Sequence, residues 1–392
     1  SRIGAAEPDV LPLFQQARGA GRAVGFVTTA RVTHSSVAPF YARAEDMRAE
    51  NDIAEQLVAF APDVAIGGGA RYFLPRGEGD GRRTDERNLL AEAEAAGIEV
   101  RHGGAAMDSA VAEGAAAEGA AAEGAAADGA VAPRLVLLGE THLPHALDRQ
   151  GDPSVPALGE LVDEALQRLQ ATGKPWFLVV EAARLDHAAR DHDAAALTAG
   201  VVEMTDALRR VLEDPDAARV LTVLVSDHDT ASPAMLANAR PDSLAVVRSS
   251  IEVMEWRIFR GRRWRGTPRD LLAEASPVLD AGALQTGLYA DDLDRLLQAE
   301  DVYERRTALG NAISRRFGIA FLDYSAQISM EVTPGVTREL VPVRAWGPRA
   351  AEAEVLRDHA ALGAWLRDVM DLPPGRSGPA EPPSVDTPGE DR

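Results

Sequence analysis

Apolar positions along the chain fall into two patterns, short continuous runs and longer segments with helical spacing. The continuous runs are bounded by polar residues, as buried strands are; they cover Ala23 to Thr28, Arg134 to Leu138 and Phe177 to Val180. The segments with helical spacing cover Val10 to Ala20, Pro156 to Thr172, Ala195 to Leu212 and Ala350 to Met370. Their alternation predicts an α/β fold, a three-layer α/β/α sandwich around a largely parallel sheet.

This alternation is interrupted by a charged, mostly helical insertion at residues 248–300. We expect residues 1–230 and 301–371 to form the α/β domain. Arg305 to Phe321 and the strand around Val341 to Ala345 are expected to return to the sheet. The insertion is either a functional surface, meaning a cap over the substrate or a dimer surface, or a helical excursion packed by its own aromatic residues. We favour the packed excursion.

Two further segments depart from the pattern. Residues 105–132 repeat Ala, Glu and Gly, a composition that predicts a partly helical or disordered surface insertion. Residues 372–392 are rich in Pro, Gly, Ser and acidic residues, which predicts a disordered tail.

Composition narrows the classes of partner. The 392 residues are 46% hydrophobic, enough for a large core, and no apolar stretch reaches the length of a bilayer span. A formal net charge of −20 argues against nucleic acid or an anionic membrane as a partner. The chain has no cysteine, which excludes disulfides and thiol chemistry and leaves the redox compartment undetermined.

Acids and histidines gather after two predicted strands. The first strand ends at Val180 and is followed by Glu181, Asp186, His187, Asp191, His192 and Asp193. A second run, beginning at Val220, is followed by Asp227 and His228. Open α/β sheets bind ligands beyond the carboxyl ends of their strands. The two clusters therefore predict a divalent-metal site at one edge of the sheet.

The same segments resemble the alkaline phosphatase family, in its bacterial form. Val180 to His187 is similar to the family pattern VEGGRIDH, and Val225 to Thr230 to VTADHET. Further ordered likenesses are Val24 to His34 (VGLVTTTRVTH), Asp63 to Pro75 (DVILGGG, then YFLP), His142 to Arg149 (HLPY..DR) and Val341 to Pro348 (VPVFAYGP).

The resemblance implies a phosphomonoester hydrolase with two zinc ions and an accessory magnesium. In such sites two metals ~4 Å apart clamp an in-line displacement. Glu181 and Ser36 match the magnesium ligands, Asp227 and His228 match ligands of the second zinc, and Asp186 matches a ligand of the first. The implied ligand is a phosphate monoester or phosphate ion. The family also suggests a homodimer and a periplasmic or secreted location, which this sequence leaves undetermined.

Two expected histidine ligands of the first zinc are replaced, by Arg190 and by Val336. A guanidinium stays protonated and cannot coordinate a metal. At ~4 Å it would repel a dication by about 8 kcal/mol at an effective dielectric of 20, so we expect the first zinc site to be lost. The arginine that binds phosphate in the family aligns with Met47, which leaves the adjacent Arg48 as a possible phosphate contact.

No serine nucleophile is visible. In the family, the helix and strand at Val10 to Thr28 come after the nucleophile segment, so we expect a fragment or a shortened gene. Asp108-Ser109-Ala110 has the letters of the nucleophile motif, but it lies at the wrong place in the family order and opens the low-complexity run. We interpret it as a coincidence.

His187 and His192 are poor replacements for the lost ligands. In a helix they would lie about 100° and 240° around the axis from Asp186. Arg190 stands four residues after Asp186, the spacing of a helical ion pair, so we expect the guanidinium to occupy the first metal position. Two functions remain open: a hydrolase with an altered site that works with fewer metals, and an inactive pseudophosphatase that binds metal or a partner.

Overall fold

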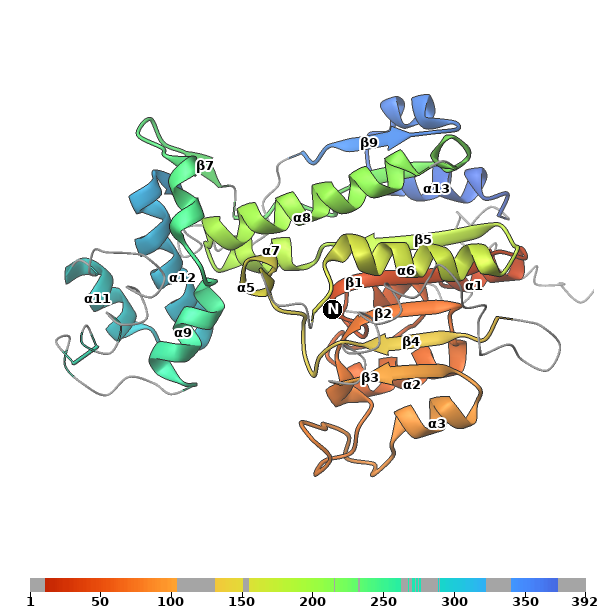
Figure 1. Ribbon diagram of the computed structural model, residues 1–392, viewed down its shortest axis with the longest axis horizontal. Helices are drawn as coiled ribbons and strands as arrows, with labels where there is room; N and C mark the ends of the chain where they lie inside the picture. The colour runs from red at the N-terminus through yellow and green to blue at the C-terminus, as the bar shows by residue number, and fades with distance from the viewer. Residues whose placement is uncertain are drawn as a thin grey trace, which may run out of the picture.

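The computed structural model describes residues 11–103, 131–150, 155–214, 216–231, 233–261, 290–321 and 340–372, with isolated residues between 262 and 289. Figure 1 shows a lobe built around the sheet and a helical lobe beside it. Several expectations fall outside the described residues: the repeats of 105–132 almost entirely, the Asp108-Ser109-Ala110 motif, Val336, and the tail beyond Leu372.

The expected parallel sheet is confirmed. Its five strands run in the order β3-β4-β2-β1-β5, and every neighbouring pair is parallel. The strands are β1 (Ala23–Arg31), β2 (Val64–Gly68), β3 (Glu99–His102), β4 (Arg134–Leu137) and β5 (Trp176–Glu181). In this register Thr28 stands opposite Glu181, which sets both at the carboxyl edge.

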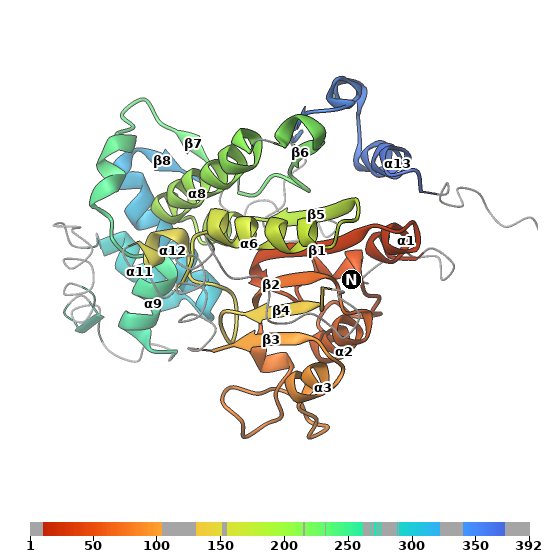
Figure 2. The same cartoon turned by 45° about the vertical axis from the view of Figure 1, so that its right-hand side comes forward.

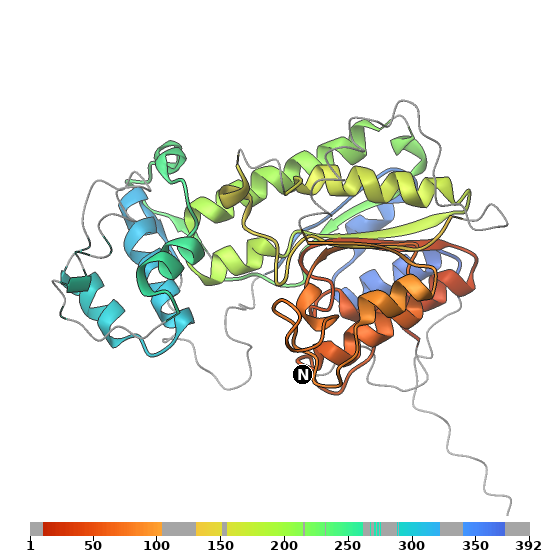
Figure 3. The same ribbon diagram turned by 60° about the horizontal axis from the view of Figure 1, so that its bottom comes forward.

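Helices cover both faces of the sheet, which completes the three layers (Figure 3). One face carries α6 (Leu158–Ala171) and α8 (Ala194–Glu213). The other carries α1 (Leu13–Gly19), α2 (Glu50–Phe60), α3 (Leu89–Ala95) and α13 (His359–Val369). Helix α6 lies on the sheet because its apolar residues repeat every three or four positions, and they are buried: Leu158, Leu161, Val162, Ala165 and Leu169.

The strand after α8 does not join the main sheet. Strand β6 (Thr222–Val225) pairs antiparallel with β9 (Val343–Trp346), and β7 (Ala234–Met235) with β8 (Ile319–Ala320). The expected return of two segments to the main sheet, Arg305 to Phe321 and the strand around Val341 to Ala345, is wrong. The first ends in β8, which pairs with β7, and the second forms β9, which pairs with β6. Figure 1 places β9 and α13, and Figure 2 places β6 and α13, on the side of β5 away from β1.

A second apolar core joins α9 (Ile251–Phe259), α11 (Ala290–Gln298) and α12 (Val302–Ser314) to the start of α8. Phe259 is buried there, as expected of an aromatic that packs the insertion, whereas Trp256 is 65% exposed. Among the described residues, none of the helices has the length and apolar character of a bilayer span.

The helix predicted at Ala350 to Met370 is divided. A 3-10 turn covers Ala350–Val355, and α13 begins after Asp358, whose carboxylate accepts a hydrogen bond from the Ala361 N–H at 2.7 Å. This N-cap starts a new helix because the side chain satisfies a free N–H group of the first turn.

Candidate active site

The candidate ligands lie where the segments after β5 and β6 meet. Glu181 ends β5, and helix α7 (Arg184–Arg190) follows with Asp186. The Thr230 hydroxyl, beyond β6, donates a hydrogen bond of 2.7 Å to Asp186 Oδ1. The proximity expected from the sequence is thus present, although the two strands belong to different sheets.

Glu181 is held by neutral hydroxyl groups. Thr28 Oγ1 donates to Glu181 Oε2 at 2.5 Å, and Ser36 also hydrogen-bonds this carboxyl. Burial raises the pKa of Glu181, and these hydrogen bonds offset the effect only in part. The corner formed by Glu181, Thr28 and Ser36, here called the glutamate corner, groups three oxygen-bearing side chains, as a hard cation prefers.

Asp186 is paired with a positively charged side chain. Arg190 Nε lies 2.6 Å from Asp186 Oδ2, at the expected i,i+4 spacing. Burial opposes ionisation of Asp186, but the hydrogen bond and charge of Arg190, with the Thr230 hydroxyl, outweigh it and hold the pKa below its ordinary value. We call Asp186, Arg190 and Thr230 the arginine corner.

Three histidines gather beside these corners: His187, which the sequence analysis considered a poor replacement ligand, and His34 and His142, which it did not consider as ligands. The ring centroid of His142 lies 4.4 Å from that of His187 and 5.6 Å from that of His34. His34 Nδ1 is 2.7 Å from Ser36 Oγ, and an Arg184 N–H donates to His187 Nδ1 at 2.9 Å.

Burial disfavours the protonated form of all three rings. Burial, followed by neighbouring Arg and His charges, lowers the pKa of His34 and His142, and lowers that of His187 to about 3. The loop that carries His142 comes close because Gly68 has no side chain: a Cβ there would lie 1.9 Å from the Thr141 carbonyl oxygen. A useful sequence signal was present, since His34 and His142 each follow a predicted strand.

Asp227 and His228 form an open pair. The Asp227 side chain is 76% exposed, and its Oδ2 lies 3.4 Å from His228 Nε2. His228 Nδ1 lies 3.1 Å from the Thr230 hydroxyl, which links the pair to the arginine corner.

The remaining polar candidates have structural contacts away from the corners. Arg48 is largely exposed and lies 3.5 Å from Asp46. The His192 ring stacks on Phe321, with centroids 4.9 Å apart. Asp193 accepts hydrogen bonds from Ala196 N and Ile251 N, at 2.9 and 2.6 Å, and so joins α8 to α9.

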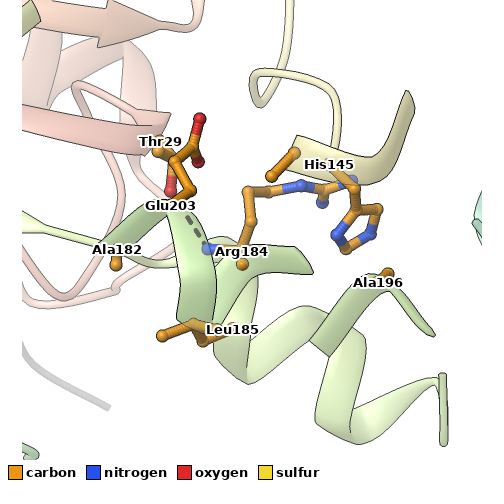
Figure 4. A pocket seen from close by; sticks show the side chains of 9 residues that line it. Thr29, His145, Ala182, Arg184, Leu185, Ala196 and Glu203 are labelled. Carbon is orange, nitrogen blue, oxygen red and sulfur yellow. Dashed lines mark hydrogen bonds between the residues drawn. The ribbon is translucent and has the colours of Figure 1, made fainter. Parts of the chain in front are cut away.

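A small cavity is lined by residues of α7 and α8, among others (Figure 4). In its lining, the backbone N–H of Arg184 donates to Thr29 Oγ1 at 3.1 Å, and His145 and Glu203 add polar groups. Its volume is about 10 Å³, the space of about one water molecule. A phosphate ester would not fit there.

The described residues do not complete a metal site. Within that part of the chain, no group of three or more His, Asp or Glu side chains is placed to hold a metal ion. Asp227 and His228 lie next to each other, and Asp186 is already paired with Arg190.

Comparison with known proteins gives a consistent result. The chain matches the family profile "Alkaline phosphatase" over residues 3–366. It is 31% identical over 236 residues to the membrane-bound alkaline phosphatase of Bombyx mori, a match that covers 53% of this chain and 40% of that protein. It is 29% identical over 237 residues to the repressible alkaline phosphatase of Saccharomyces cerevisiae, covering 56% and 40%. The match thus spans less than half the length of these relatives.

Solved structures agree on the fold. The Thermus thermophilus alkaline phosphatase superposes with a TM-score of 0.64 at 27% identity, covering 79% of this chain and 63% of that one. A cold-active alkaline phosphatase from Shewanella sp. gives a TM-score of 0.64 at 20% identity, covering 91% and 78%, and supports the fold alone.

Proposed function

Since this chain belongs to the alkaline phosphatase family, we propose that it is the α/β part of a phosphomonoester hydrolase whose metal site is altered. The resemblance to this family implies zinc and magnesium as the metals. The observation that carries the proposal is the glutamate corner at the carboxyl edge, where hydroxyl groups hold a buried carboxyl beside the Asp186–Arg190 pair.

We assign the corners different tasks. Glu181 and Ser36 are the candidate magnesium ligands, and Asp227 and His228 the candidate ligands of a second metal. Arg190 takes the place of the first metal and supplies a fixed positive charge. A guanidinium binds phosphate oxygens well in its own right, so Arg190 can hold a phosphate group without a metal. We assign no nucleophile among the described residues.

The alternative is a pseudophosphatase that binds phosphate or a partner without turnover. The pairing of Arg190 with Asp186 favours this alternative. A guanidinium in the first metal position cannot act as the Lewis acid that a metal would provide. For the 392-residue chain on its own we expect little or no hydrolysis.

The test is hydrolysis of p-nitrophenyl phosphate by the 392-residue chain and by the natural full-length product, both with added zinc and magnesium. A hydrolase is supported if the full-length product turns over substrate and Asp227→Ala abolishes it. Asp216→Ala is the matched control, because Asp216 is also exposed but lies near Arg219 rather than in the site. No turnover by either protein supports the pseudophosphatase.

A further inference from the structure

Helix α7, which carries residues of the candidate site, lies between the sheet and the helical lobe (Figure 1). Its C-terminal end is in direct contact with α12. A Cβ on Gly310 of α12 would lie 2.0 Å from the Asp191 carbonyl oxygen, so the two backbones approach as closely as glycine allows. The Ser314 hydroxyl, also of α12, donates to the carbonyl oxygen of His192 at 2.7 Å. The helical lobe therefore fixes one end of the helix that carries the site.

The first turn of α9 is also fixed to the rest of the chain. The Ile251 N–H donates to Asp193 Oδ2 at 2.6 Å, and the same carboxylate caps the start of α8. Because one carboxylate joins the starts of both helices, the entry of α9 is held close to α7. The next residue of α9 is Glu252, and its carboxylate pairs with the guanidinium of Arg184, the first residue of α7.

Glu252 is shared by two arginines and a histidine. Besides Arg184, it has Arg306 of α12 as a partner, whose Nη2 donates to Glu252 Oε1 at 3.0 Å. His145 Nε2 lies 3.4 Å from Glu252 Oε2, and Figure 4 shows the Arg184 side chain reaching toward this ring. Burial opposes ionisation of Glu252, but His145 and the two arginines outweigh it and hold the pKa of Glu252 well below its ordinary value. A single anion thus joins α7, α9 and α12.

Arg184 links this anion to His187. The Arg184 side chain is 8% exposed, and its Nη1 lies 2.9 Å from His187 Nδ1. A guanidinium can only donate hydrogen bonds, so His187 Nδ1 accepts, and the uncharged ring carries its proton on Nε2. The ring centroid of His187 lies 4.4 Å from that of His142 and 5.9 Å from that of His34. The Arg184 contact therefore decides which nitrogen of His187 can donate a hydrogen bond within this group of rings.

We propose that Glu252 is a positioning residue of the candidate site, which holds Arg184 so that its guanidinium fixes the ring orientation and the proton position of His187. The helical lobe then contributes to the site as well as packing its own residues. Arg184 and Arg306 contact the same carboxylate, so they would repel each other without it, and Arg184 would withdraw from His187. The geometry of this link stands on the contacts alone, whereas its effect on turnover rests on the proposed function.

A second ion pair between the same two helices supplies the matched control. Glu255 lies one turn after Glu252 on α9, and its Oε1 accepts a hydrogen bond from Arg305 Nε of α12 at 2.7 Å. Its side chain is 3% exposed, compared with 31% for Glu252, so this pair is the more buried of the two. The Arg305 guanidinium packs over the Phe259 ring of α9, 5.0 Å from its centroid. Loss of Glu255 should therefore weaken the helical lobe without disturbing His187.

Nitrogen-15 NMR of the imidazole rings tests the proposal, with the His187 signals assigned from a His187→Gln sample. The wild type should show an unprotonated Nδ1, a protonated Nε2 and a coupling across the hydrogen bond to Arg184. In Glu252→Ala this coupling should be lost, and the two nitrogen signals should move toward each other as the ring exchanges between tautomers. In Glu255→Ala the coupling and both signals should stay as in the wild type. Circular dichroism checks folding; Glu252→Gln and Glu255→Gln, which keep the side-chain shape, replace an alanine variant that does not fold.

Two spectroscopic results would overturn the proposal. One is a coupling that persists without Glu252, and the other is an equal loss of the coupling in Glu255→Ala, which would mean that any weakening of the helical lobe disturbs His187.

Hydrolysis of p-nitrophenyl phosphate by the natural full-length product measures the consequence for the site. Glu252→Ala should lower kcat/KM at least about tenfold, with Glu255→Ala close to the wild type. Unchanged hydrolysis after loss of the coupling would reject the positioning role. Absence of hydrolysis in the wild type would reject the proposed function instead, and the NMR spectra would still decide whether Glu252 fixes His187.

Discussion

The glutamate corner and the arginine corner lie at the same sheet edge, but their carboxylates are satisfied in opposite ways. Glu181 accepts hydrogen bonds from hydroxyl groups, which carry no net charge, and its pKa is raised. Asp186 is paired with the Arg190 guanidinium, and its pKa is lowered. Among the described residues, hydroxyl groups are the partners of Glu181, whereas Asp186 has a cationic partner. A guanidinium repels a dication, so Arg190 disfavours metal binding at Asp186.

The largest expected effect comes from Arg190→His. The substitution removes the positive charge and gives Asp186 an imidazole at i,i+4, so zinc should bind at least about 100-fold more tightly, or about 2.7 kcal/mol. Competition with a chromogenic chelator measures it. Arg190→Ala is the control, because it removes the charge without adding a ligand. Equal zinc affinity for the two variants would contradict a metal position at Asp186.

Removing one hydroxyl group from each corner should lower the free energy of unfolding by different amounts. Thr28→Val leaves both Glu181 and the buried Ala30 N–H without the Thr28 hydroxyl, so it should cost about 2 kcal/mol. Thr230→Val should cost only about 1 kcal/mol, because Asp186 keeps Arg190. Urea unfolding followed by circular dichroism gives both values. A larger cost for Thr230→Val than for Thr28→Val would mean that Asp186 is stabilised mainly by Thr230 rather than by Arg190.

The corners should also respond to pH with opposite signs. The folded pKa of Asp186 is depressed, so its stabilisation, about 1 kcal/mol for a partly exposed pair, is present above its unfolded pKa and is lost as the pH falls. The folded pKa of Glu181 is raised, so its contribution is lost as the pH rises from the unfolded pKa through the folded one.

Unfolding curves between pH 3 and pH 7 test this contrast. In Asp186→Asn, the free energy of unfolding should fall less between neutral and acidic pH than it does in the wild type. In Glu181→Gln, it should fall less as the pH rises toward neutral. Magnesium should stabilise the wild type more than Glu181→Gln. The same sign for both variants would show that the two carboxylates are in equivalent environments.

Local patterns predicted much of this structure. The apolar run before Glu181 predicted strand β5, and the spacing of Asp186 and Arg190 predicted their ion pair. Both predictions succeeded because they depend on residues close in sequence. The parallel sheet followed from the alternation of strands and helices.

Features set by distant packing were not predicted. That β6 pairs with β9 rather than with the main sheet depends on partners more than 100 residues away. The grouping of His34, His142 and His187 required the strand order, which a single sequence does not state. The break before α13 was predictable in principle, since Asp358 is a favourable N-cap residue.

Whether the Arg190 guanidinium occupies the first metal position is tested most directly by anomalous diffraction at the zinc edge from zinc-soaked crystals. For the wild type we predict no zinc at Asp186, with the Arg190 Nε still about 2.6 Å from the carboxylate; Arg190→His crystals, soaked alongside, should show zinc there. Zinc bound to Asp186 in the wild type, with Arg190 displaced, would contradict it.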